Sequence, residues 1–80
     1  MSILYNKKMN KDELLKLAYK IKYARDKKGL SQEKLAELAD VGMSTVTKLE
    51  RGVGNITLKN LYKIAEVLDL NLGIINNKEL

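Results

Sequence analysis

Apolar residues recur at helical spacing in several stretches of this 80-residue chain. The first stretch predicts a helix over residues 11–28, with an Asn10–Glu13 capping box at its start and Gly29 as its left-handed end. Its apolar positions lie three or four residues apart. The residues that recur on this side are Leu14, Leu17, Ala18, Ile21 and either Ala24 or Arg25. This pattern indicates one amphipathic helix with a single buried side.

Two shorter helices follow, separated by a tight turn at residues 40–42. The first covers residues 32–39 and begins after Ser31 as its N-cap, whereas the second covers residues 43–51 and ends at Gly52. Asp40 is expected to take a positive φ, which Asp tolerates better than most residues. The apolar side chains of both helices are spaced to face one another, and they are Leu35, Ala36, Ala39, Val41, Val46 and Leu49.

The last part of the chain changes its periodicity. Thr57 is predicted to cap a fourth helix, whose apolar stripe ends at Leu68. Leu70, Leu72 and Ile74 then alternate with Asn71 and Gly73, and Ile75 follows, which is typical of a β-strand. We therefore divide the chain into an N-terminal arm at residues 1–9, a helical domain at residues 10–69 and a C-terminal strand and tail at residues 70–80.

The composition narrows the range of functions. Eighty residues suffice for one small domain, no stretch has the roughly 18 consecutive apolar residues of a membrane span, and no signal peptide opens the chain. The chain has no Cys and no His, so the usual zinc ligands and the commonest general base are missing. We expect a cytoplasmic protein without membrane attachment, metal or cofactor, and not an enzyme.

Charge is distributed unevenly along the chain. The formal net charge is +5, and residues 1–29 contain nine Lys or Arg side chains against three acidic ones. Such an excess favours polyanionic partners, because each neutralised phosphate releases condensed counterions. A solvated surface that only maintains solubility accounts for the charge equally well.

The segment GLSQEKLAELADVGMSTVTKLERG, residues 29–52, resembles the helix-turn-helix of the phage Cro and C1-type repressors and of the xenobiotic-response-element regulators. The resemblance extends over residues 17–70. It implies an all-α, lambda-repressor-like domain of four helices that binds double-stranded DNA. The motif residues that occur together at the family's spacing are Gly29, Ser31, Gln32, Leu35, Ala36, Val46, Leu49, Glu50 and Gly52.

The resemblance also implies roles for individual residues. The base-reading positions at the exposed start of the third helix are Met43, Ser44, Thr47 and Lys48. Contacts with the DNA backbone are implied for Gln32, Thr45 and Arg51, and Lys59 is added as a polar residue near the start of the fourth helix. A structural ion pair is implied between Arg25 and Glu50. Met43 is open to two interpretations, partial packing against a neighbour or contact with a thymine methyl group.

The C-terminus departs from most of these relatives, which end in a fifth helix. The predicted strand instead resembles the HipB-type antitoxin repressors, in which this strand pairs with its copy in a second subunit. A lone strand leaves backbone groups unpaired, so pairing in a homodimer would satisfy them. The implied dimerisation residues are Leu70, Leu72, Ile74 and Ile75. The alternative is that this segment folds back on the first and fourth helices.

Three functions are compatible with these patterns. The first is a transcriptional repressor that binds a palindromic operator as a homodimer. The second is an antitoxin that neutralises a toxin protein and regulates its own operon. The third is an adaptor with the same fold and no affinity for DNA. We favour the first, although the third helix lacks Arg, Asn and Gln on its reading face and therefore has few strong base readers.

Overall fold

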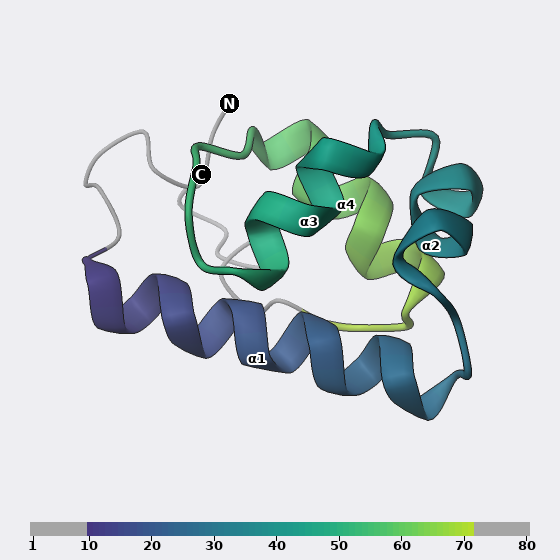
Figure 1. The fold of residues 1–80 in the computed structure, drawn as a ribbon, viewed down its shortest axis with the longest axis horizontal. Helices are drawn as coiled ribbons and strands as arrows, with labels where there is room; N and C mark the ends of the chain where they lie inside the picture. The colour runs from purple at the N-terminus through teal and green to yellow at the C-terminus, as the bar shows by residue number, and fades with distance from the viewer. Residues whose placement is uncertain (1–9, 72–80) are drawn as a thin grey trace.

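The computed structural model describes residues 10–71, which form four α-helices (Figure 1). Their bounds are α1 Lys11–Lys27, α2 Gln32–Ala39, α3 Met43–Glu50 and α4 Leu58–Val67. The predicted all-α fold class and the four predicted helices are confirmed. The predicted arm at residues 1–9 lies outside the described residues, as does the predicted strand from residue 72 onward.

Each helix begins at a residue with extended backbone, and three of them have a side-chain cap. Asn10 and Glu13 form both hydrogen bonds of the capping box at α1. Ser31 accepts from the Lys34 N–H at 2.9 Å, and Thr57 accepts from the Asn60 N–H at 3.2 Å. Gly42, which precedes α3, provides no side-chain cap. These contacts satisfy backbone N–H groups that a helix start otherwise leaves unpaired.

The four helices enclose one apolar core. α3 packs against both α1 and α2, and α2 also packs against α4. The largest fully buried side chains come from all four helices, and they are Ile21, Leu35, Val46, Leu49, Leu61 and Ile64. Ala36 and Ala39 are also buried, and their small side chains allow α2 to approach its neighbours closely. No helix within residues 10–71 is long and apolar enough to cross a membrane.

The residues after α4 continue the core. The Leu70 N–H donates to the Ala65 carbonyl at 2.9 Å, and the Leu70 side chain packs against the buried cluster. Of the predicted dimerisation residues, Leu70 alone falls within the described part of the chain. Leu72, Ile74 and Ile75 lie outside it.

Candidate nucleic-acid interface

The helix α3 presents one exposed face. Val46 and Leu49 are buried against the core, whereas Met43, Ser44 and Lys48 are exposed on the other side. Figure 1 shows α3 in front of α4 and alongside α1, so that this short helix lies at the surface of the bundle. An α-helix exposed in this way has the dimensions to enter a DNA major groove.

Thr47 is less exposed than the other predicted base-reading residues. Its hydroxyl donates to the Met43 carbonyl within α3 at 3.0 Å, and it also lies 3.5 Å from Oε1 of Gln32. Gln32 is the first residue of α2, so this contact joins the start of α2 to the middle of α3. The structure therefore places a predicted backbone-binding residue beside a predicted base-reading residue.

Glu50 accepts hydrogen bonds from two other helices. Arg25 of α1 donates to it from Nε at 2.6 Å and from Nη2 at 2.9 Å, and Gln32 of α2 donates from Nε2 at 3.0 Å. The side chain of Glu50 is only 2% exposed, and that of Arg25 is 11% exposed. Arg25 Nη1 also donates to the Leu30 carbonyl at 2.6 Å. The bidentate pair and its neighbours thus connect α1, α2 and α3.

The protonation of Arg25 reflects this environment. Hydrogen bonding to Glu50 raises the pKa of the Arg25 guanidinium, and the charges of Glu50 and Asp26 act in the same direction, whereas burial opposes them. Within residues 10–71 every buried side-chain nitrogen or oxygen has a hydrogen-bond partner. A satisfied ion pair of this kind holds α3 in one orientation relative to the other helices.

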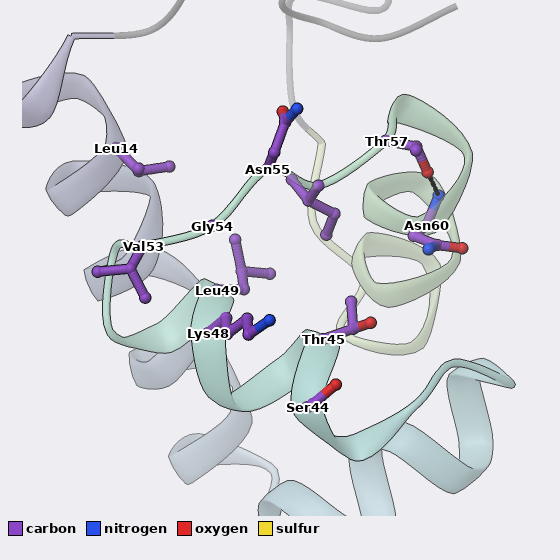
Figure 2. Close-up of a pocket in the computed structure, with 11 residues that line it drawn as sticks. Leu14, Ser44, Thr45, Lys48, Leu49, Val53, Gly54, Asn55, Thr57 and Asn60 are labelled. Carbon is purple, nitrogen blue, oxygen red and sulfur yellow. Dashed lines mark hydrogen bonds between the residues drawn. The ribbon is translucent and has the colours of Figure 1, made fainter.

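A hollow of about 160 Å³ lies between α3, the following loop and the start of α4 (Figure 2). Figure 2 shows Lys48 of α3 and Asn60 of α4 extending toward the space between the two helices. Ser44, Thr45 and Asn55 also line the hollow. Hydroxyl, amide and ammonium groups are the side-chain donors that bind phosphate oxygens in protein–DNA interfaces. The hollow therefore gathers several polar side-chain donors beside α3.

Gly54 shapes the wall of this hollow. Its φ is +89°, and a Cβ at this position would lie 3.4 Å from both Cβ and Cδ of Lys48. A Cβ would make only ordinary van der Waals contact at that distance, so it is the left-handed backbone that favours glycine here. The loop then places Asn55 at the hollow, a contribution that periodicity alone could not reveal because it depends on the path of the loop.

Three of the predicted backbone-binding residues do not line the hollow: Gln32, which begins α2, Lys59 and Arg51. Lys59 instead lines a separate hollow with Tyr62, Lys63 and Leu70 on the other side of α4. Arg51 is exposed at the C-terminal end of α3. Ser44, Thr45 and Lys48 are the predicted residues that line the hollow together with Thr57 and Asn60 at the start of α4. Within residues 10–71 no cluster of three or more acidic side chains could hold a metal ion.

A family model described as helix-turn-helix matches residues 21–75. Among curated proteins, an uncharacterized HTH-type transcriptional regulator of Rickettsia prowazekii is 39% identical over 56 residues. That match covers 70% of this chain and 43% of the relative, so the chain spans less than half of that relative's length.

Two solved structures are similar over most of their length. The restriction-modification controller protein C.AhdI from Aeromonas hydrophila is 38% identical, with a TM-score of 0.72, covering 80% of this chain and 97% of that one. The N-terminal DNA-binding domain of SinR from Bacillus subtilis is 32% identical, with a TM-score of 0.68, covering 80% and 96%. These likenesses match the fold and the helix-turn-helix derived above.

Proposed function

The chain belongs to the Cro/C1-type helix-turn-helix family of DNA-binding regulators, and from this premise we propose that it is a sequence-specific transcriptional repressor that acts in the cytoplasm. The observation that carries the proposal is the exposed face of α3. Val46 and Leu49 pack the inner side of α3 against the core, and the hydrogen bond from Arg25 to Glu50 holds its C-terminal end. A rigidly held helix with a polar outer face can read bases in a major groove.

We assign base reading to four residues of α3, and they are Met43, Ser44, Thr47 and Lys48. Three of them are exposed, and Met43, at 50% exposure, can offer its thioether side chain to a thymine methyl group. Because none of the four makes the bidentate contacts of Arg, Asn or Gln, DNA shape should contribute to the preference.

Backbone contacts are assigned to Gln32, Thr45, Arg51 and Lys59. Thr45 lines the hollow beside α3, and Gln32 begins α2, where backbone N–H groups also point outward. The amide nitrogen of Gln32 already donates one N–H to Glu50, so its second N–H is the one proposed for phosphate.

A homodimer is proposed because one domain of this size offers few base contacts. Two copies of α3, placed one helical turn of DNA apart, would read the two half-sites of a palindromic operator. The proposed pairing uses the segment that begins at Leu70 and continues through Leu72, Ile74 and Ile75, whose backbone needs a partner strand.

The decisive experiment is a selection of binding sites from random DNA, followed by measurement of stoichiometry and of variant affinities on the selected operator. Lys48→Ala and Thr47→Ala should change the preferred sequence, with a discrimination of about 1 to 3 kcal/mol for a good base contact. Gln32→Ala should weaken binding to all sequences similarly. Unchanged preference in both α3 variants would contradict the assignment of α3 as the reading helix.

The controls separate this function from its alternatives. Lys16→Ala, an exposed change on α1, should leave both affinity and preference unaltered. A stoichiometry of one chain per selected site would contradict the homodimer. An absence of salt-sensitive DNA binding would instead favour the adaptor function, and a stable complex with a toxin encoded beside this gene would identify an antitoxin.

A further inference from the structure

The outer side of α1 carries three large side chains that follow one another by a helical turn. Leu15, Tyr19 and Tyr23 are 45%, 70% and 54% exposed. Residues four apart lie on the same face of a helix, about 6 Å apart along its axis, so these three form one row. We define the tyrosine stripe by Leu15, Tyr19 and Tyr23. Large apolar and aromatic side chains gathered on a surface commonly mark a site of interaction.

The tyrosine stripe lies on the side of α1 that the core does not use. Figure 1 shows α1 along one edge of the bundle, with the other three helices on one side of it. The buried residues of α1 are Ala18, Ile21 and Arg25, which face those helices. A partner can therefore reach the stripe without separating α1 from the core.

Two open hollows lie along the stripe. One is lined by Leu15 and Tyr19, and the other by Tyr19 and Tyr23. Tyr19 and Lys20 line both hollows, so the Tyr19 ring stands where the two meet. A helix that docks on such a surface places side chains at i and at i+3 or i+4 into neighbouring hollows. The spacing of the stripe, one turn of α1 between neighbours, matches this kind of contact.

Lysines predominate around the stripe. Lys16 lines one hollow, Lys27 lines the other, and Lys20 lines both. The ammonium of Lys27 lies 5.7 Å from the centroid of the Tyr23 ring. Among the described residues that line either hollow, Asp12 is the one acidic residue. Three cations against one carboxylate favour a partner that carries negative charge.

We propose that the tyrosine stripe binds an acidic amphipathic helix of a partner protein. Apolar side chains of that helix enter the hollows on either side of Tyr19, and its Glu or Asp side chains pair with Lys20 and Lys27. Tyrosine suits this contact because its ring buries a large area while its hydroxyl stays available for a hydrogen bond. The inference is independent of the proposed DNA-binding function, since no residue assigned to DNA contact lines either hollow.

Charge and ring geometry make other occupants less suitable. The same face of a second copy would place its lysines against these lysines. Residues 1–9 contain two Lys and no acidic residue, and residues 72–80 contain one Lys and one Glu, so neither sequence supplies an excess of negative side chains. Tyr19 and Tyr23 already stack on each other with centroids 6.2 Å apart, which leaves less ring face for the bases of a single-stranded nucleic acid.

The direct test titrates the full, isotope-labelled chain with a synthetic helical peptide and records amide signals by nuclear magnetic resonance. The peptide has leucines at positions i, i+3, i+4 and i+7 and glutamates at its other positions. Its binding should shift signals of residues 15–27 and weaken as salt is added. Shifts spread evenly over the chain, shifts confined to α3, or no binding would overturn the proposal.

Two further probes test the chemistry of the occupant. The same peptide with lysines in place of its glutamates should not bind, because it would meet the lysines of α1. Equal binding of the two peptides would contradict the charge complementarity and overturn the proposal. Stronger shifts of residues 15–27 by a single-stranded oligothymidylate would assign the stripe to nucleic acid instead, which would also overturn it.

Variants of the full chain locate the binding. Tyr19→Ser with Tyr23→Ser should weaken binding of the glutamate peptide about tenfold, as expected for the loss of aromatic anchors. Lys20→Glu should weaken it several-fold. Lys34→Glu, an identical charge change at an exposed residue of α2 that lines neither hollow, is the matched control and should have a smaller effect. Equal losses in the two lysine variants would mean that only the overall charge matters and would overturn the proposal.

Two measurements keep this test separate from folding and from DNA binding. Both tyrosines are exposed, so the double serine variant should keep the wild-type melting temperature, and Lys20→Glu provides the answer if it does not. The double serine variant should also keep the wild-type affinity for the selected operator. A loss of operator affinity would place the stripe in the DNA interface and overturn the proposal. Peptide binding by a chain that binds no DNA would contradict only the proposed function.

Photo-crosslinking in cells that carry the gene identifies the natural occupant. Replacement of Tyr19 by p-benzoylphenylalanine in the full chain should yield a crosslink to an acidic, helically patterned segment of another protein, located by mass spectrometry. Crosslinks to this chain itself, to a second copy or to a segment without acidic residues would overturn the proposal, as would the absence of any crosslink.

Discussion

Glu50 is the residue on which the orientation of α3 depends. It accepts two hydrogen bonds from Arg25 and one from Gln32 while its own side chain is nearly inaccessible to solvent. Taking a carboxylate and a guanidinium out of water is costly, and their mutual hydrogen bonds offset that cost only while both partners are present. At this position a single substitution therefore affects three helices at once.

Arg25→Ala should destabilise the protein by about 3 kcal/mol, because Glu50 would keep a buried charge without its main partner. Thermal unfolding followed by circular dichroism measures the change. Since the pKa of Arg25 is raised, the contribution of its charge is complete at neutral pH and is lost only under strongly alkaline conditions.

The control for this prediction is Lys22→Ala, an exposed change on the same helix, which should have little effect on the melting temperature. Equal melting temperatures for Arg25→Ala and the wild type would show that the Arg25–Glu50 ion pair contributes nothing measurable to the stability of the fold.

At the scale of elements, all four helices end in the same way. In each, a residue with positive φ is followed by an apolar residue whose N–H donates to a carbonyl five residues earlier. This is the Schellman motif. It directs Leu30, Val41 and Leu70 back onto the core, whereas Val53 is 45% exposed. The residues with positive φ are Gly29, Asp40, Gly52 and Asp69, and the apolar residues that follow them are Leu30, Val41, Val53 and Leu70.

The two glycines of these motifs have different surroundings. Gly29 and Gly52 have φ values of +70° and +72°, but a Cβ on Gly29 would meet nothing within 4 Å, whereas one on Gly52 would lie 2.7 Å from Cδ2 of Leu15. Gly29→Ala should cost about 1 kcal/mol from the left-handed backbone alone. Gly52→Ala should cost more, because Leu15 must also move.

Chemical denaturation of both variants measures the difference, and adding Leu15→Ala to Gly52→Ala removes the obstructing side chain. The extra cost of Gly52→Ala over Gly29→Ala should shrink in that background. Equal costs for the two single variants would mean that Leu15 moves aside freely.

Asp40 takes the left-handed conformation with φ of 57° in the turn between α2 and α3. Asp40→Gly should stabilise the protein by about 0.5 to 1 kcal/mol, since glycine adopts this conformation without the penalty of a Cβ. The side chain contributes little, because its oxygen is 3.8 Å from Lys63 Nζ and it is almost fully exposed. Lys63 also donates to the Asp40 backbone carbonyl, which glycine retains.

Denaturant titration measures this gain, and Asp69→Gly provides the comparison. Asp69 has the same φ of 57°, but its carboxylate accepts from Lys28 Nζ at 2.9 Å, so its replacement should gain less. A loss of stability in Asp40→Gly would show that the aspartate side chain has a role in the turn beyond its backbone conformation.

At the scale of the whole molecule, two surfaces differ in chemistry. The hollow beside α3 is lined by hydroxyl, amide and ammonium groups, whereas a hollow on α1 combines the rings of Tyr19 and Tyr23 with Lys20 and Lys27. The net charge of +5 attracts polyanions to the whole domain, but a specific complex requires particular cations to meet particular phosphates. Salt dependence distinguishes general attraction from individual contacts.

The affinity for the selected operator should fall steeply with salt concentration, and Arg51→Ala should reduce the slope of log affinity against log salt by about one, as expected for one phosphate contact. Fluorescence anisotropy over a range of salt concentrations measures the slope. Lys16→Ala is the matched control and should leave the slope unchanged. A reduction as large in Lys16→Ala as in Arg51→Ala would mean that Arg51 acts only through the overall charge.

The sequence by itself determined the helices and their ends, because periodicity, caps and turn residues are local properties. The residues Asn10, Ser31 and Thr57 were identified as caps from their neighbours alone, and Gly29 and Asp40 were identified as left-handed positions. Asp69 was not predicted to take a left-handed conformation. The residues around it do not distinguish an aspartate that ends a helix from an aspartate on a solvated surface.

The tertiary structure alone decided which side chains meet. Gln32 meets Glu50 and Thr47, Lys59 lies apart from the hollow beside α3, and Leu70 lines one hollow with Tyr19 and Tyr23. All three results depend on how helices far apart in the chain pack together. Periodicity assigns a residue to the inside or the outside of one helix. Periodicity contains no information on which residue of another helix a side chain meets, because that partner depends on the angles between helices and on the paths of the loops.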